Sequence, residues 1–275
     1  MSIDLLESLK ETIKNNNLLA KKSLGQNFLF DLNITKRMVQ AVGDLENLTI
    51  VEVGPGPGAL TRAIASKLPS SYVAIEKDSR FIPILEEIQK VTCPFGIMLD
   101  DALSVSYEEI YNAHGKKPLA IIANLPYNIA TPLLIGWLKK LPFIHSLTLM
   151  LQKEVVQRIL AKPDTSAYGR LGVLCQWLCE GYKVIEIPPS AFIPQPKVTS
   201  AVVHLRPKKN FQENFCLFES FEKVTHHAFC KRRKMIKSSL KDLFDLEKLE
   251  DLGLTPTNRA EVLQVEDFVK LAKAL

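Results

Sequence analysis

Four segments of the chain place glycine, acidic or amide residues at the end of an apolar run. Gly54, Gly56 and Gly58 follow "TIVEV", Glu76 ends "YVAIE", Asp101 follows "FGIMLD", and Asn124 ends "LAIIAN". Apolar runs of this length, bounded by turn residues, are typical of strands buried on both faces of a parallel sheet. Because ligands of open α/β sheets bind beyond the carboxyl ends of the strands, the four segments predict one shared ligand site.

The glycine loop over residues 54–58 indicates which kind of ligand this site takes. Glycine permits positive φ and lets a ligand approach the backbone closely. Pro55 and Pro57 interrupt the loop, however, and proline has no N–H to donate to a phosphate. The loop also lacks the G-K-[ST] sequence of phosphate-binding loops. A dinucleotide-dependent oxidoreductase is therefore disfavoured, and a cofactor without phosphates, such as S-adenosylmethionine, fits better.

Glu76 and Asp101 have the chemistry to bind the nucleoside part of such a cofactor. Glu76 follows Gly54 by 22 residues and can accept hydrogen bonds from two ribose hydroxyls. Asp101 can accept a hydrogen bond from the adenine amine, with Ala102 and Leu103 against the ring. Each acid alone could equally cap a strand end or the helix after it. The hypothesis therefore rests on their occurrence at successive strand ends.

The segment "NLPY", which starts at Asn124, indicates a reaction. An exocyclic amine of adenine is a poor nucleophile because its lone pair is delocalised into the ring. The side-chain oxygen of Asn124 and a backbone carbonyl held by Pro126 could accept its two hydrogens, and Tyr127 could stack on the base. The alternative is a proline turn before a helix capped by Thr131 with Pro132 at its first position. That alternative leaves Asn124 and Tyr127 unexplained.

Phe192 is a second candidate for stacking on the target base. A base must leave its stack to reach a corner of this kind. Phe192, in "SAFIPQP", lies on a loop that could close over the opposite face of the base. An ordinary buried aromatic side chain is an equally favoured alternative.

Alternating strand and helix patterns predict the elements that position these residues. Over residues 49–152 they indicate a parallel sheet covered by helices on both faces, an α/β fold. A helix is expected over 168–182. Strands over 183–187 and 200–205 are expected to pair as an antiparallel hairpin at the sheet edge, and residues 2–20 are expected to form an amphipathic helix.

The sequence changes character near residue 206. Helical patterns without strand signals follow, so we predict a first domain over 1–206 with an N-terminal helical arm and a helical domain over 207–275. Residues 206–241 hold ten basic and three acidic residues, a net charge of +7 in a chain of net charge +5. Such a block suggests a polyanion partner, and a solvated helix face is the alternative. The predicted contacts to RNA backbone are Lys231, Arg232, Arg233 and Lys234.

Composition narrows the class of protein further. The 275 residues are 47% hydrophobic and 24% charged, which is typical of a globular protein. No apolar run is long enough to span a bilayer, and the N-terminal residues lack the pattern of a secretory or transit peptide, so a cytoplasmic location without membrane contact is expected. The five cysteines form no C-x-x-C pair and the five histidines are scattered. We therefore expect reduced thiols and no bound metal.

Taken together, these motifs resemble the bacterial small-subunit (16S) rRNA adenine N6,N6-dimethyltransferase family. The resemblance spans roughly residues 21–240 in the family's order. It is carried by "KKSLGQNFL" (21–29), "VEVGPGPGALT" (51–61), "IEKD" (75–78), "DDAL" (100–103), "NLPYNIATPLL" (124–134), "LQKEVVQRI" (151–159), "YGRLGVL" (168–174), "PPSAFIPQPKVTSAVVHL" (188–205) and "RRKMIKSSL" (232–240).

The resemblance implies a Rossmann-like class I methyltransferase sheet, mostly parallel with an antiparallel edge strand, and a small helical C-terminal domain that binds RNA. The implied contacts to S-adenosylmethionine are Asn27, Leu29, Gly54, Glu76, Asp101 and Asn124, and the implied catalytic corner is Asn124, Leu125, Pro126 and Tyr127. The implied reaction dimethylates two adjacent adenosines in the 3′-terminal hairpin of small-subunit rRNA during ribosome biogenesis. Small-subunit rRNA and immature 30S particles are then the partners, and a monomer is expected.

Two other functions compete with this one. A large-subunit rRNA adenine methyltransferase of the macrolide-resistance type would share the glycine loop and the Asn-x-Pro-Tyr segment. The stretches "YGRLGVL" and "FIPQPKVTSAVV" favour the small-subunit enzymes. A non-catalytic ribosome assembly factor is the second alternative. The intact Asn124 and the intact cofactor loop argue against lost catalysis.

Overall fold

The computed structural model describes residues 9–15, 18–21, 25–231 and 233–275. The chain divides into two compact units, each assembled from two stretches of sequence. The first unit combines Met1–Lys153 with Tyr182–Arg206, and the second combines Glu154–Gly181 with Pro207–Leu275.

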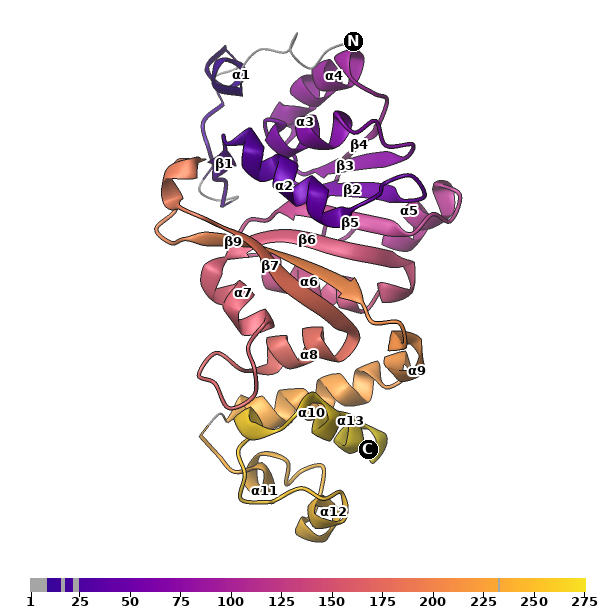
Figure 1. The fold of residues 1–275 in the computed structure, drawn as a ribbon, viewed down its shortest axis with the longest axis vertical. Coiled ribbons are helices and arrows are strands. Elements are labelled where there is room, and N and C mark those ends of the chain that lie inside the picture. Colours follow the sequence, from indigo (N-terminus) through magenta and orange to yellow (C-terminus); the bar gives the residue numbers. More distant parts are fainter. Residues whose placement is uncertain (1–8, 16–17, 22–24, 232) are drawn as a thin grey trace. The chain divides into compact units, whose positions relative to one another are not determined.

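A seven-stranded sheet forms the centre of the first unit, in the order β4-β3-β2-β5-β6-β9-β7 (Figure 1). Its strands are β2 (Thr49–Val53), β3 (Tyr72–Glu76), β4 (Gly96–Leu99), β5 (Leu119–Asn124), β6 (Ile144–Gln152), β7 (Cys179–Ile187) and β9 (Ser200–Pro207). The strands from β4 to β6 pair in parallel, and β9 is antiparallel to β6. The predicted mostly parallel sheet with an antiparallel edge is confirmed, and β9 and β7 are neighbours at that edge as expected.

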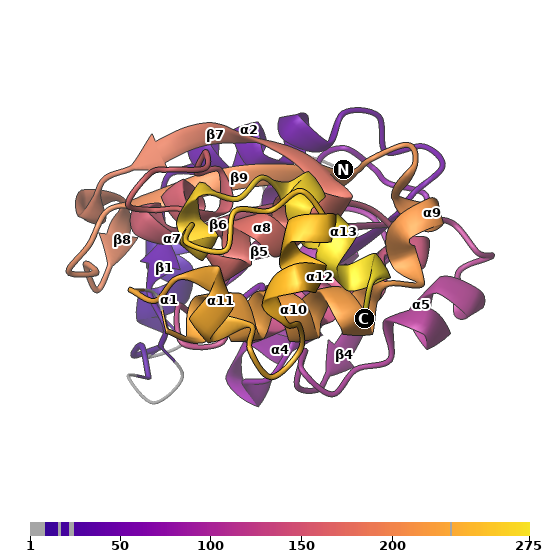
Figure 2. The same ribbon diagram turned by 90° about the horizontal axis from the view of Figure 1, so that it is seen from below.

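Helices cover both faces of this sheet. One face packs against α2 (Leu32–Val42), α3 (Ala59–Ala65) and α4 (Ile82–Val91), whose apolar side chains share a core cluster with alternate strand residues. Figure 2 shows α2 and α5 (Tyr107–Ala113) on opposite sides of the sheet. An edge-to-face contact between Tyr107 and Trp137, with ring centroids 6.0 Å apart, joins α5 to α6 (Ala130–Leu138). Burial on both faces explains why β2 and β3 are apolar almost throughout.

A small second sheet lies beside the main one. In it β1 (Phe28–Leu29) pairs antiparallel with β8 (Phe192–Ile193). Runs of two residues carry no readable periodicity, so the sequence did not predict this pairing. Of the helix expected over 2–20, α1 (Leu9–Asn15) is confirmed, residues 18–20 are not helical, and residues 2–8, 16 and 17 lie outside the described residues. Single turns of 3₁₀ helix complete the unit at Ser79–Phe81 (η3), Leu141–Phe143 (η4) and Pro189–Ala191 (η5).

The second unit is helical. Its helices are α7 (Lys153–Ile159), α8 (Arg170–Leu178), α9 (Phe211–Phe215), α10 (Phe218–Cys230), α11 (Ile236–Ser239), α12 (Leu246–Asp251) and α13 (Val265–Lys273), with a 3₁₀ turn, η6, at Ala260–Val262. Trp177 of α8 stacks on Phe221 of α10 at 3.8 Å between ring centroids. Phe268 of α13 contacts the same Phe221 at 6.4 Å, so aromatic packing joins the three helices.

Two boundaries differ from the sequence-based expectations. The helix predicted over 168–182 ends at Leu178, because residues from Cys179 onward pair with β9 and the sheet overrides the helical pattern. Residues 154–178 group with the C-terminal helices rather than with the sheet, although they precede the predicted boundary at residue 206. The Trp177 stack and a hydrogen bond from the Tyr168 hydroxyl to the Leu263 carbonyl (3.0 Å) account for this grouping.

The described residues contain no helix long and apolar enough to cross a membrane. Over the same residues, no group of three or more His, Cys, Asp or Glu side chains is placed to hold a metal ion. The cysteines are free thiols, buried at Cys93, Cys175 and Cys179 and exposed at Cys216 and Cys230.

Candidate active site

A cavity of about 240 Å³ lies in the first unit beyond the carboxyl ends of β2, β3, β4 and β5. It brings together every sequence-predicted site residue except those of the basic run. These lining residues are Asn27, Leu29, Gly54, Glu76, Asp101, Asn124, Leu125, Pro126, Tyr127 and Phe192. They come from segments far apart in the sequence, which parallel β-α-β connections bring to the same end of the sheet.

The glycine loop leaves room for a ligand where a side chain would fill it. Gly54 has φ +69°, and a Cβ atom added there would lie 4.0 Å from the Asn124 carbonyl oxygen. Gly56 has φ +54°, and its N–H donates to Glu76 Oε2 at 2.9 Å. Glycine is required at position 58 for a different reason, because a Cβ atom there would come within 2.3 Å of Ile88 on α4. The first two glycines line the cavity with positive φ, and the third is required by packing against α4.

Glu76 is fixed at the end of β3 by backbone donors. Besides Gly56, the N–H of Asp78 donates to Oε1 at 2.7 Å. The residue is 6% exposed, and burial raises the pKa of its carboxyl above the ordinary value. Each carboxylate oxygen has two lone pairs, so a further acceptor site on each stays available to hydroxyl donors. A ribose placed in the cavity fits this acceptor pattern, because its hydroxyls can donate to the carboxylate oxygens.

Asp101 lies in the turn after β4 with both oxygens engaged. Its Oδ2 accepts from Lys77 Nζ at 2.6 Å, and its Oδ1 accepts from the N–H of Leu103 at 3.0 Å. The hydrogen bond from Lys77 is the main cause that lowers the pKa of this carboxyl. The second lone pairs remain for an amine donor, and Ala102 and Leu103 line the cavity beside it. These residues fit the adenosyl part of S-adenosylmethionine.

The Asn124 corner is held by the sheet on one side and by a turn on the other. Asn124 is the last residue of β5 and pairs with Met150 on β6. The N–H of Ile129 donates to the Pro126 carbonyl at 3.2 Å and closes the turn. The Tyr127 hydroxyl lies 2.7 Å from the Ser200 hydroxyl on β9. Half-buried Asn124 and Tyr127 thus line the cavity from a rigid support.

The alternative interpretation of this segment, a helix capped by Thr131, is wrong. The helix α6 begins at Ala130, its N-cap residue is Ile129, and no side chain caps it. Thr131 and Pro132 therefore lie within the first turn. Proline is tolerated there because the first-turn N–H groups have no partner inside the helix.

Phe192 lines the cavity but is only 1% exposed, and it belongs to the core cluster of the first unit. On β8 it pairs with Leu29 of β1, while its neighbour Ile193 is 54% exposed. Its packing role is visible in these contacts. Stacking of Phe192 on a target base remains a prediction.

The basic run lies in the second unit, just after α10. Lys231, Arg233 and Lys234 are exposed, and Arg232 lies outside the described residues. The next residue, Met235, forms an isolated bridge with Arg259. Contact of this run with RNA backbone remains a prediction.

Sequence reasoning missed the residues that support the site from behind. Ser200 holds Tyr127, and Gln26, Asp78 and Arg80 form a polar network beside Glu76. The acid and the arginine two residues apart in "EKDSR" were a signal that an ion pair could form at the end of β3. Nothing in the sequence indicated that Gln26 would meet it, because the two segments are 52 residues apart.

Comparison with known proteins identifies relatives along the whole chain. The model of the ribosomal RNA adenine dimethylase family matches residues 17–275. The ribosomal RNA small subunit methyltransferase A of Agrobacterium fabrum is 48% identical over 278 residues, which cover 100% of this chain and 99% of that protein. The protein of the same name from Brucella abortus is 46% identical over 279 residues, with the same coverage.

Two solved structures share the fold. A dimethyladenosine transferase from Plasmodium falciparum superposes with a TM-score of 0.75 at 25% identity, covering 89% of this chain and 95% of that one. The 23S rRNA methyltransferase ErmE gives 0.69 at 25% identity, covering 90% and 99%. The sheet order and these neighbours place the protein among the class I S-adenosylmethionine-dependent methyltransferases. Since the family model covers nearly the whole chain, the protein belongs to the ribosomal RNA adenine dimethylase family.

Proposed function

We propose that this enzyme dimethylates the N6 amines of two adjacent adenosines in the 3′-terminal hairpin of small-subunit (16S) rRNA. The observation that carries the proposal is the shared cavity, in which Asn124 and Tyr127 face the same space as Glu76 and Asp101. Support for the small-subunit substrate comes from relatives 46–48% identical that bear the name small subunit methyltransferase A.

In the proposed mechanism the protein positions the base and orients its lone pair. When bound, S-adenosylmethionine supplies the methyl group as an electrophile. The side-chain oxygen of Asn124 and a backbone carbonyl of the turn at Pro126 accept the two amine hydrogens, which turns the nitrogen lone pair out of conjugation with the ring. Tyr127 stacks on the base and fixes its plane. Methylation leaves a cationic amine, which loses its proton to water without a strong base.

The same corner accommodates two rounds of transfer on one adenosine. After the first round the amine keeps one hydrogen, and either acceptor can hold it while the lone pair points at the donor. Flipping a base out of a stack costs a few kcal/mol and least where the base is already unpaired, as in a hairpin loop. The hairpin therefore supplies the bases, and RNA further away supplies the binding energy.

The proposed wider context is ribosome assembly. The exposed basic run over 231–234 would contact RNA backbone around the hairpin in immature 30S particles. We further propose that the enzyme acts in the cytoplasm and as a monomer. A short isolated hairpin would be a poor substrate, because it offers the target bases without the distant backbone.

Transfer of labelled methyl groups tests the proposal directly. The purified enzyme is incubated with labelled S-adenosylmethionine and either immature 30S particles, 23S rRNA or a short 3′ hairpin, and the RNA is digested for mass spectrometry. We expect dimethyladenosine at two neighbouring positions near the 3′ end of the small-subunit RNA. Label confined to 23S rRNA would support the large-subunit alternative, for which the likeness to ErmE is the favouring observation. Cofactor binding without transfer to any RNA would support a non-catalytic assembly factor.

A further inference from the structure

We infer that Asp78 and Arg80 form a clasp that holds the segment before β1 against the cofactor side of the active-site cavity. We call this segment, residues 18–21 and 25–29, the arm. The clasp contacts the arm and not the reacting atoms, so Asp78 and Arg80 are positioning residues. The inference rests on the proposed cofactor contacts that the arm contributes.

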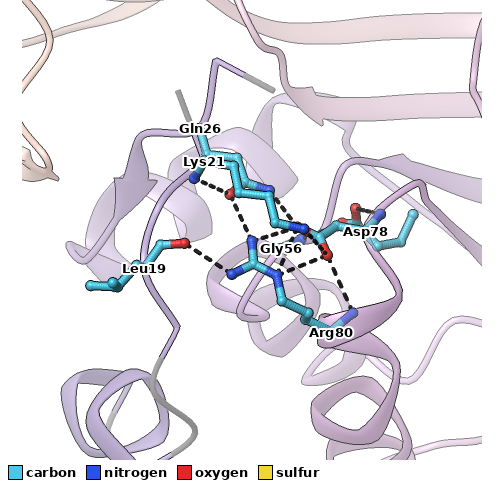
Figure 3. A network of polar contacts seen from close by, with 7 residues as sticks. Leu19, Lys21, Gln26, Gly56, Asp78 and Arg80 are labelled. Atoms are coloured by element: carbon cyan, nitrogen blue, oxygen red, sulfur yellow. Dashed lines mark hydrogen bonds and ion pairs between the residues drawn. The ribbon is translucent and has the colours of Figure 1, made fainter. Parts of the chain in front are cut away.

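The Asp78 carboxylate is the centre of the clasp (Figure 3). Its side chain is 2% exposed. Arg80 Nη2 donates to Oδ2 at 2.6 Å and Arg80 Nε donates to Oδ1 at 3.0 Å. From the arm, Gln26 Nε2 donates to Oδ2 at 3.1 Å and Lys21 Nζ lies 3.5 Å from Oδ1. The guanidinium holds the pKa of Asp78 well below its usual range, so the carboxylate stays charged at neutral pH.

Arg80 carries the contact onward to the backbone of the arm. Its Nη1 donates to the Leu19 carbonyl at 3.0 Å, and its Nη2 lies 3.4 Å from Gln26 Oε1. The same Gln26 oxygen accepts the N–H of Lys21 at 2.9 Å. One planar guanidinium therefore bridges the turn after β3 to two points of the arm. A lysine could keep the charge but not this set of directed donors.

The clasp and the cofactor acid belong to one turn. The N–H of Asp78 donates to Glu76 Oε1, so a shift of Asp78 would move the carboxylate that faces the ribose. On the arm, Phe28 packs edge-on against Phe81, the residue after Arg80, with ring centroids 5.7 Å apart.

At its other side the arm meets the catalytic corner. Gly25 has φ +63°, and a Cβ there would lie 3.0 Å from Asn128 Oδ1 and 3.4 Å from Pro126 Cβ. Asn27 is oriented by its own hydrogen bond to the Gly25 carbonyl, at 3.2 Å. Between these two anchors, Asn27 and Leu29 line the cavity. Loss of the clasp would leave Asn27 and Leu29 free to move away from the cavity.

Strand pairing holds the arm less than it holds the rest of the cavity wall. Its only strand pairing among the described residues is the two-residue β1–β8 sheet, whereas the glycine loop, Glu76 and Asn124 continue strands of the main sheet. The position of the arm therefore depends on the clasp and on the buried side chains of Leu18, Phe28 and Leu29.

The test uses variants of the full-length enzyme on either side of the clasp. Arg80→Leu removes the contacts of Arg80 to Leu19 and Gln26. Gln26→Leu removes the contacts of Gln26 to Asp78 and Arg80 while leaving the Asp78–Arg80 pair. Arg158→Leu is the control, because Arg158 has an exposed ion pair with Glu154 and does not line the cavity. We expect Kd and KM for S-adenosylmethionine to rise about tenfold or more in both clasp variants, with kcat at saturating cofactor within about twofold of wild type. The Kd and KM of Arg80→Lys should lie between those of the two clasp variants and those of wild type.

Hydrogen exchange of the arm separates positioning from mere stability. S-adenosylhomocysteine should slow exchange over residues 18–29 in wild type and in Arg158→Leu, and much less in Gln26→Leu and Arg80→Leu. Lower thermal stability with unchanged cofactor affinity and unchanged arm protection would overturn the clasp. If Arg80→Leu does not fold, the cofactor affinity and arm protection of Gln26→Leu alone test the clasp. Absence of cofactor binding by the wild-type enzyme would instead contradict the proposed function.

Discussion

The cofactor cavity and the basic run after α10 both collect charged side chains, but they hold them in opposite ways. In the cavity, Glu76 is buried and accepts two backbone N–H groups, so its position is set before any ligand arrives. In the basic run, Lys231, Arg233 and Lys234 are exposed at the surface of the second unit. Their long side chains take many rotamers in water.

This difference determines how each region can recognise its ligand. A preorganised, partly desolvated group contributes a large and directional interaction, so one substitution in the cavity should cause a large and specific loss. Exposed cations act through screened charge, and each contributes a small amount that falls with salt. The cavity is therefore suited to select a cofactor and a base, and the basic run is suited to bind RNA irrespective of its sequence.

The largest effect is expected at the reacting corner of the cavity. Asn124→Ala removes an acceptor for the amine hydrogens, and kcat should fall on the order of a hundredfold or more. The thermal midpoint should move little, because Asn124 is half-buried at a strand end. Asn112→Ala, on the exposed face of α5, is the matched control. Near-normal turnover of purified Asn124→Ala enzyme would refute the catalytic assignment.

A buried acid in β2, the strand before the glycine loop, tests whether a carboxyl group held inside the protein lowers its stability. Glu52, 0% exposed, accepts hydrogen bonds from Thr61 (2.9 Å) and Tyr72, and burial raises the pKa of its carboxyl from 4.5 to about 7. Between these pH values the unfolded chain releases the proton while the folded protein retains it. Stability should therefore fall as pH rises through that window, by about 3 kcal/mol, and stay lowered above it.

Glu52→Gln should remove this part of the pH dependence, because the amide cannot ionise and its oxygen can still accept from Thr61 and Tyr72. Urea unfolding at pH 5 and pH 8 measures the effect, with Glu87→Gln on the exposed face of α4 as the control. Parallel pH profiles for wild type and Glu52→Gln would show that Glu52 does not titrate with the raised pKa.

Glu76→Ala should weaken cofactor binding by about 1.5–3 kcal/mol, because a ribose in the cavity would lose a charge-assisted acceptor. Titration calorimetry with S-adenosylmethionine measures this loss. The exposed Glu87→Ala provides the reference, and RNA affinity should be unaffected in both variants. Unchanged cofactor affinity in Glu76→Ala would mean that the carboxylate only holds the glycine loop.

Substitutions in the basic run should weaken RNA binding by small, additive amounts that depend on salt concentration. Changing Lys231, Arg232, Arg233 and Lys234 to Ala should lower the slope of log K against log salt by about 0.7–0.9 for each phosphate that the run no longer neutralises. Filter binding to small-subunit rRNA at several salt concentrations measures the slope. The control removes four exposed charges from the first unit, at Lys36, Arg37, Lys67 and Lys90. Equal slopes for wild type and the basic-run variant would leave the run as a solvated surface.

The features that could be predicted from the sequence are those set by local patterns of strands and turns. The shared position of Glu76, Asp101 and Asn124 was predictable because each lies at or just after the end of a strand, and parallel strands bring their ends together whatever the surrounding details. Asn27 and Leu29 came from family resemblance, since a two-residue strand gives no pattern of its own. The end of α8 at Leu178 was missed because pairing with β9, a long-range contact, decides the state of the residues after it.

Ser200 shows most clearly what sequence reasoning cannot supply. It is a fully buried serine on β9, and its hydroxyl lies 2.7 Å from the hydroxyl of Tyr127, 73 residues earlier. This hydrogen bond fixes the plane on which the target base is proposed to stack. Removing it with Ser200→Ala should cost about 1 kcal/mol, or roughly a fivefold loss of kcat/KM for RNA, with cofactor affinity unchanged.

A double-mutant cycle isolates this smallest effect from general damage to the strand. Tyr127→Phe keeps the ring and removes the same hydrogen bond, so Ser200→Ala, Tyr127→Phe and the double variant should lose similar amounts of kcat/KM. Ser146→Ala, which changes a buried serine on β6, should alter stability alone. If the two losses simply add, Ser200 does not act through Tyr127. Equal losses in the two single variants and the double variant would mean that Ser200 acts by fixing Tyr127. The cavity would then depend on side chains that do not themselves touch the base, whereas the basic run needs no such support.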